Sequence, residues 1–166
     1  LGEAIVETLG CLHGVLHNAA LLGPRSPTRF GVDPQRNALV GTGQWLGIRY
    51  RVVLTLAAAM PAWFWHVSLE NTGSQPLDVD LVHAQDLALA PYGAIRLNEY
   101  YVSQYVDHTP LRHDERGWVV ASRQNQALGV QHPWCVMGSL NQGVSFATDA
   151  LQLQGLASRA GAAAAL

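Results

Sequence analysis

The chain has 166 residues and a mass of 17.9 kDa, the size of one domain with an ordinary hydrophobic core, or of part of one. Its 10 cations are all arginine and stand against 12 carboxylates, giving a net charge of −2. Such a balance lacks the basic field that attracts a phosphate backbone, so we expect no nucleic-acid partner.

Cysteine usage and apolar runs narrow the expected compartment. Cys11 and Cys135 lie far apart and outside any CxxC spacing, which predicts neither a disulfide framework nor a zinc ribbon and fits a reducing cytoplasm. No apolar run reaches the roughly 18 to 20 residues of a spanning helix, so we expect a soluble cytoplasmic chain without signal peptide, anchor or membrane contact. The small residues at 157–166 predict a connection to a missing downstream part of a longer protein.

The first third of the chain has the weaker pattern. Apolar residues recur at helical spacing from Ile5 to Ala19, but Gly10 and Gly14 would each destabilise a helix by about 1 kcal/mol relative to alanine, so we favour a strand. Residues 23–43, GPRSPTRFGVDPQRNALVGTG, predict a long ordered loop, which is more often functional than filler.

The middle of the chain alternates with the period of strands. The segment from Trp45, WLGIRYRVVLTLAA, predicts one strand, and AWFWHVSLE from Ala62 predicts a second. The turn residues NTGSQP then separate the second strand from LDVDLVHAQD, a third alternating run that begins at Leu77. We therefore predict three successive antiparallel strands, the last two joined as a hairpin.

Further short strands are predicted downstream at GWVVASRQNQ from Gly117, PWCVMGSL from Pro133 and GVSFATDALQLQGL from Gly143. The spacing is typical of an all-β antiparallel β-sandwich rather than of one open sheet. We assign residues 1–166 to a single β-sandwich domain, or to a fragment of an incomplete one.

Metal binding and nucleophilic catalysis have little support in the sequence. His108 and His113 flank acidic residues in DHTPLRHDE, but no HxxxH or HExxH frame occurs and Pro110 argues against a helix. We expect no metal. The serines and Cys135 lie in no nucleophile elbow, and a chain with 12 acids offers carboxylate pairs by chance, so we assign no catalytic residue.

Sugar binding is better motivated. Carbohydrate sites combine aromatic faces, which cover the C–H surfaces of a sugar ring, with planar polar side chains that bond hydroxyl groups. Three stretches have that mixture: YYVSQYVDH, SRQNQ and QHPW. The competing interpretation is that the tyrosines tile a strand while the polar side chains pair with neighbouring backbone.

Four blocks in order carry a resemblance to a known family. NEYYVSQYVDHTPL, VVASRQNQ, HPWCVMGSL and GVSFATDALQLQGL resemble the amino-terminal β-sandwich region of glycoside hydrolase family 94. The resemblance covers residues 44–156 and is strongest to 1,2-β-oligoglucan phosphorylases and to the phosphorylase-like part of cyclic β-1,2-glucan synthases. It implies a supersandwich of the galactose-mutarotase-like type.

The resemblance also implies a division of labour in the parent protein. Members of that family are inverting glycoside phosphorylases, a class of glycosyltransferase, whose general acid and phosphate pocket lie on a helical barrel that this sequence does not contain. The parent would use inorganic phosphate as co-substrate to release α-glucose 1-phosphate from β-1,2-glucans, with no other cofactor. This chain would support the cleft, contact the barrel and contribute to a homodimer.

A surface that meets a β-glucan oligosaccharide would draw on the three polar and aromatic stretches. The predicted substrate-binding residues are Tyr101, Gln104, Asp107, His108, Arg123, Gln124, Asn125, His132 and Trp134. Two alternatives remain open: a stand-alone carbohydrate-binding module, and a dimerisation or interaction scaffold without sugar affinity. We interpret NEYYVSQYVDHTPL as a seam beside a sugar cleft rather than as a self-sufficient active site.

Overall fold

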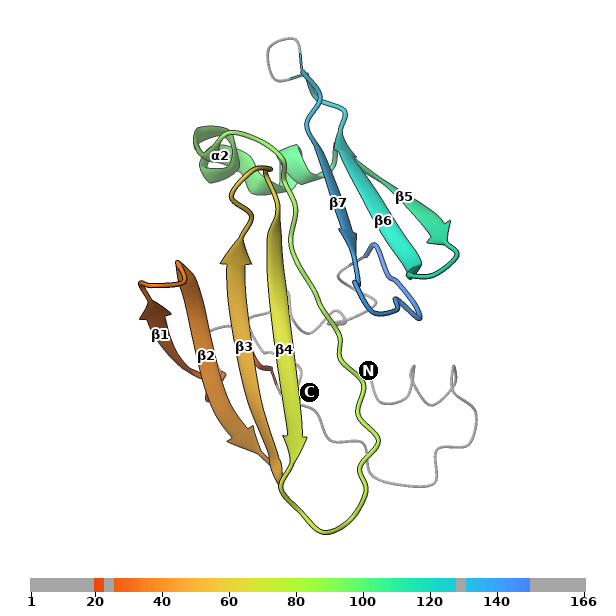
Figure 1. The fold of residues 1–166 in the computed structure, drawn as a ribbon. Coiled ribbons are helices and arrows are strands. Elements are labelled where there is room, and N and C mark those ends of the chain that lie inside the picture. The colour runs from red at the N-terminus through yellow and green to blue at the C-terminus, as the bar shows by residue number, and fades with distance from the viewer. Residues whose placement is uncertain (1–19, 23–25, 128–130, 150–166) are drawn as a thin grey trace. The chain divides into compact units, whose positions relative to one another are not determined.

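The computed structural model describes residues 20–22, 26–127 and 131–149 (Figure 1). The chain divides into two compact units, with the boundary between Leu81 and Val82. In the described ranges, seven strands form two antiparallel sheets, and one helix is present. The two sheets confirm the predicted all-β class. The expectations for residues 5–19 and 157–166 lie outside the described residues. No helix of the described part is long and apolar enough to cross a membrane.

The first unit contains a sheet of order β1-β2-β3-β4 (Figure 1). Its strands are β1 (Arg29–Asp33), β2 (Ala38–Trp45), β3 (Ile48–Leu56) and β4 (Trp63–Asn71), and each pairs antiparallel with the next. The predicted strands from Trp45 and Ala62 are thereby confirmed as β3 and β4. Leu46 and Gly47 join β2 to β3 with φ of 44° and 79°, the left-handed backbone that a two-residue hairpin turn requires.

The core of this sheet is built around the alternation of β3. Ile48, Tyr50 and Val52 are buried, whereas Arg49 and Arg51 between them are exposed. The Tyr50 hydroxyl lies 3.0 Å from Thr28 Oγ1, which gives the buried phenol a polar partner. Its ring leaves no room for a side chain on the paired Gly43, because a Cβ there would overlap the phenol.

Two predictions in the first unit are wrong. Residues 29–43, which belong to the segment predicted as a loop, lie in the β1–β2 hairpin. Residues 77–86, predicted as the third strand, form no strand, and Leu77, Val79 and Leu81 are exposed. The backbone directly after β4 bonds to the β2–β3 turn. The amide and the hydroxyl of Thr72 each donate to Gly47 O at 2.7 Å.

The second unit contains helix α2 (Tyr92–Ser103) and a sheet of order β5-β6-β7. The strands are β5 (Val106–His113), β6 (Gly117–Gln124) and β7 (Trp134–Gly138), all paired antiparallel. The predicted strands from Gly117 and Pro133 are confirmed. The strand predicted from Gly143 is wrong for residues 143–149, where Gly143 makes only an isolated parallel bridge to Gly117; its remainder lies outside the described residues.

The helix is the second departure from the expected pattern in this unit. The tyrosines of NEYYVSQYVDHTPL were interpreted either as a sugar site or as residues tiling a strand, but Asn98–Ser103 belongs to the end of α2. Asn98 has non-helical backbone angles, φ −159° and ψ 80°, and its Oδ1 accepts from Tyr101 N at 3.1 Å. The side chain therefore restarts the helix after a kink, as an N-cap does. The sequence predicted that Pro110 does not lie in a helix, and this residue is part of the edge strand β5.

Candidate functional site

All the predicted substrate-binding residues lie in the second unit, at the end of the three-stranded sheet where β6 finishes and β7 begins. Arg123 of β6 pairs with Asp107 of β5 on one side and with Trp134 of β7 on the other. Because directly paired residues of antiparallel strands point to the same face, their side chains form one row across the sheet. We call these three residues the cross-strand row.

The best-defined contact in the row is between Arg123 and Trp134. The Arg123 Cζ lies 5.7 Å from the centroid of the Trp134 ring, within cation–π range. Trp134 nevertheless remains 59% exposed, so part of the indole faces solvent. Arg123 Nε is buried and meets no hydrogen-bond acceptor among the described residues. The row thus presents an aromatic face and a guanidinium with unused donor capacity.

Asp107 is held by the residue after β6 instead of by Arg123. Asn125 Nδ2 donates to Asp107 Oδ2, and Asn125 N donates to Tyr105 O at 2.7 Å. Between Asp107 and Arg123 no ion pair within 4.0 Å occurs in the described structure. Asp107 therefore offers its second oxygen as an acceptor beside the guanidinium.

Two tyrosines lie at the carboxyl end of α2 and just after it. Tyr105 donates its hydroxyl hydrogen to Tyr101 Oη at 3.1 Å, and the rings meet edge to face with centroids 5.1 Å apart. The hydrogen bond to Tyr101, together with the charge interaction between the two phenols, raises the pKa of Tyr105. Gln104 follows the helix as its C-cap and donates its backbone amide to Tyr100 O at 3.3 Å.

The remaining predicted residues lie on the opposite face of the sheet or bond to the backbone. His108 Nδ1 lies 2.9 Å from Ser122 Oγ, a buried hydroxyl in the register position opposite it. His132 Nδ1 lies 3.1 Å from Gln124 O and joins the segment before β7 to the end of β6. Since neighbouring residues of a strand alternate in direction, His108 and Gln124 point away from the face that carries the cross-strand row.

Gln124 is completely buried and its amide is fully engaged. Its Nε2 donates to Ala88 O at 2.8 Å and to Val102 O at 3.1 Å, and its Oε1 accepts from Gln126 N at 2.9 Å. The side chain thus fastens β6 to the end of α2 and to the segment before the helix. This geometry gives Gln124 a positioning role behind the candidate site.

Two members of this arrangement, Tyr105 and Ser122, are absent from the predicted substrate-binding residues. The separation of four residues between Tyr101 and Tyr105 is a sequence signal for such a pair, because residues four apart meet on one helical face. Ser122, the partner of His108, carries no such signal because the contact depends on strand register. No group of three or more histidine, cysteine, aspartate or glutamate side chains gathers in the described ranges.

The arrangement is suited to holding a polar ring compound. The exposed indole can cover a C–H face, while the guanidinium, carboxylate and amide can bond hydroxyl groups. The cross-strand row supplies one carboxyl group, Asp107, beside these aromatic and hydrogen-bonding groups.

Comparison with known proteins shows which family the chain belongs to. A 1,2-beta-oligoglucan phosphorylase of Listeria innocua serovar 6a (strain ATCC BAA-680 / CLIP 11262) is 38% identical over 93 residues, which are 56% of this chain and 8% of that protein. No solved structure gives a significant match. The family model for the SOGP N-terminal domain matches residues 12–166, and the chain belongs to that family.

Proposed function

We propose that the chain is the non-catalytic sandwich portion of an inverting glycoside phosphorylase of glycoside hydrolase family 94, and that its cross-strand row contacts the β-1,2-glucan substrate. The similarity to a region of a 1,2-beta-oligoglucan phosphorylase supports the parent activity. In that reaction, inorganic phosphate attacks the anomeric carbon while a carboxylic acid elsewhere in the parent protonates the leaving oxygen. The parent acts in the cytoplasm and needs no further cofactor.

The observation that carries the binding proposal is the exposed indole of Trp134 beside Arg123. An aromatic ring that remains 59% exposed while a guanidinium covers part of it offers both a stacking surface and hydrogen-bond donors. Asp107 and Asn125 add an acceptor and an amide at the same end of the sheet. A glucose unit needs this combination, since its ring is apolar on both faces and polar around its rim.

The test is a proton–nitrogen NMR titration of the chain with short β-1,2-glucooligosaccharides, with cellobiose as the linkage control. The proposal expects resonances of Tyr101, Arg123 and Trp134 to shift with the β-1,2 sugar. Well-dispersed spectra that ignore both sugars would contradict sugar contact by this surface. The same titration of a full-length parent phosphorylase, with its barrel present, would then decide whether the row acts only in the assembled protein.

A second function has a separate observation in its favour. On β7 and the segment after it, Val136 is 63%, Leu140 is 64% and Val144 is 78% exposed. Large exposed apolar side chains gathered along one segment are typical of a surface that another part of a protein covers. Contact with the parent's helical barrel, or with a second copy in a homodimer, would explain them without sugar affinity.

A further inference from the structure

The exposed face of the four-stranded sheet contains a concavity of about 230 Å³. It is formed by Val40 of β2, Arg51, Val53 and Thr55 of β3, and His66 of β4, with Asp33 and Arg36 from the β1–β2 turn at its rim. Arg51, Val53 and Thr55 alternate along β3, and Val53 pairs with both Val40 and His66, so these side chains share one face. The concavity is therefore a property of the first unit alone.

The floor of the concavity is apolar. Val53 is only 8% exposed, and Ala38, which also lines it, is 3% exposed. A low-dielectric floor strengthens the electrostatic interactions of charges placed above it. The volume is several times the roughly 30 Å³ that one water occupies in the liquid, so it admits a tetrahedral oxyanion and part of an attached group.

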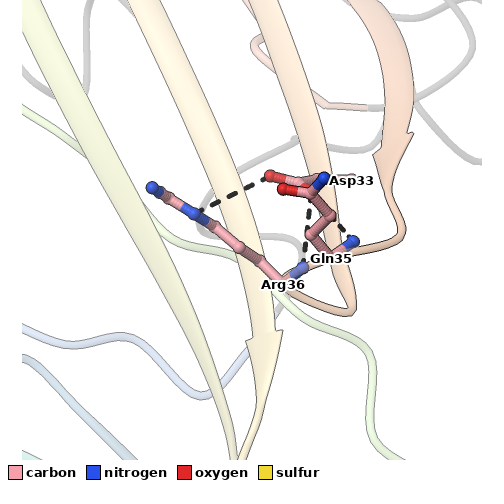
Figure 2. A network of polar contacts seen from close by, with 3 residues as sticks. All are labelled: Asp33, Gln35 and Arg36. Carbon is pink, nitrogen blue, oxygen red and sulfur yellow. Dashed lines mark hydrogen bonds and ion pairs between the residues drawn. The ribbon is translucent and has the colours of Figure 1, made fainter.

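The acidic group at the rim is already engaged by its own turn. Asp33 Oδ1 accepts from Gln35 N at 3.1 Å and from Arg36 N at 3.3 Å, and Asp33 Oδ2 lies 3.9 Å from Arg36 Nε (Figure 2). These contacts fix the turn and hold the Arg36 side chain at the edge of the concavity. They also spread the negative charge of Asp33 over several donors.

Two arginines on the same face of β3 are in different electrostatic situations. Arg49 pairs across the sheet with Glu70, and their side chains form an ion pair of 3.0 Å. Arg51 instead lies between Thr42 and Ser68, which carry no charge, and it has no ion pair or hydrogen bond within the described residues. Of these two guanidinium groups, the one that lines the concavity is thus the one without an ion-pair partner in the described structure.

Two further groups add donors to this positive site. His66 Nε2 lies 3.3 Å from Thr55 Oγ1, so an imidazole and a hydroxyl are joined at the wall of the concavity. With a neutral imidazole, one of the two donates to the other, and the pair keeps one hydrogen to donate to an oxygen atom of a ligand. With Arg36 and Arg51 positive and Asp33 negative, the site keeps a net positive charge even when His66 is neutral.

We propose that this concavity binds a phosphate group, with Arg51 as the principal fork and with Arg36 and the His66–Thr55 pair as additional donors. A guanidinium matches two oxygens of a phosphate through parallel hydrogen bonds. The divalent charge of phosphate suits two arginines better than the single charge of a carboxylate does. The inference is independent of the proposed sugar contact, because it rests on a different sheet.

The test is a proton–nitrogen NMR titration of the full chain with inorganic phosphate, against sodium acetate and sodium chloride at matched ionic strength. The proposal expects saturable shifts of Arg51, Val53 and His66 with phosphate only. Equal shifts with acetate would replace phosphate by a carboxylate as the ligand and overturn the proposal as stated. Shifts that follow chloride equally, or the absence of shifts, would overturn it as a binding site.

A matched pair of variants separates the site from general charge effects. Arg51→Gln should weaken phosphate binding by roughly tenfold or more, because it removes a charge-assisted bidentate contact. Arg49→Gln removes the same charge from the same strand and face but should leave phosphate affinity unchanged. If circular dichroism shows that Arg51→Gln does not fold, Arg36→Gln in the exposed turn takes its place. Equal losses in the site variant and in Arg49→Gln would contradict the proposal.

Discussion

Arg123 covers part of the Trp134 ring with its Cζ 5.7 Å from the ring centroid, yet its own Nε is buried without an acceptor in the described structure. A buried donor without a partner is costly, typically by about 1–3 kcal/mol. A ligand would therefore meet this pair at Trp134, which is 59% exposed, and not at the buried nitrogen.

Trp134→Ala should weaken binding of β-1,2-glucooligosaccharides by about tenfold or more, because it removes the stacking surface of the cross-strand row. Trp134→Phe should retain part of the affinity, since a smaller aromatic face remains. Isothermal titration of each variant measures the effect. Val136→Ala is the control, because Val136 is exposed two residues along the same strand. Equal losses of sugar affinity in Trp134→Ala and Val136→Ala would contradict stacking on the Trp134 ring.

Tyr101→Phe should lower the pKa of Tyr105 towards its ordinary value. In the wild type, the Tyr105 hydroxyl donates to Tyr101, and this bond stabilises the protonated phenol and raises its pKa. Removing the acceptor removes both that stabilisation and the repulsion between two phenolates. Carbon NMR of the tyrosine Cζ atoms against pH gives the measurement, and Tyr100→Phe on the preceding residue is the control. An unchanged titration of Tyr105 in Tyr101→Phe would contradict the hydrogen bond.

Strand β3 was predictable because its own residues alternate between buried and exposed positions. The β1–β2 hairpin was not predictable, because Gly41 and Gly43 give β2 a composition that is typical of a loop. The space that a side chain on Gly43 would need is occupied by the Tyr50 ring of β3, and the space beside Gly41 is occupied by Thr28 and Phe30. Such a requirement comes from a neighbouring strand and has no trace in the local pattern.

The candidate site was predictable in composition but not in arrangement. The sequence identified Asp107, Arg123 and Trp134 in three separate stretches, and only the register of β5, β6 and β7 brings them into one row. The same register separates His108 and Gln124 from that row. Strand alternation alone would have divided Asp107 from His108, but the pairing partners across the sheet depend on where each turn begins.

The Cys135 thiol should react slowly with iodoacetamide near neutral pH. Burial raises its pKa, so the reactive thiolate is a smaller fraction than in an ordinary cysteine at the same pH. The reaction rate should begin to increase only at a higher pH than it does for an ordinary cysteine. Unfolding in urea should restore the reaction rate of an ordinary exposed thiol. A Cys11→Ser background isolates the signal. A fast reaction at neutral pH in the folded chain would contradict the burial of this sulfur.

Gln124→Ala should destabilise the fold by about 2–4 kcal/mol, because it leaves one buried and one part-buried carbonyl without their donor and opens a cavity. The affected acceptors are Ala88 O and Val102 O, at 2.8 and 3.1 Å from Gln124 Nε2. Urea unfolding followed by circular dichroism measures the change. Gln124→Glu is a sharper test, since it keeps the size of the side chain but replaces the donating amide by an acceptor.

Gln104→Ala provides the matched control for stability, because Gln104 is an exposed glutamine at the end of α2 that bonds to the helix through its backbone amide. Its substitution should change the unfolding free energy by no more than about 0.5 kcal/mol. A loss in Gln124→Ala as small as in Gln104→Ala would mean that the amide does not fasten β6 to the helix. In that case Gln124 would be free to turn towards a ligand, and the division between a binding face and a supporting face would fail.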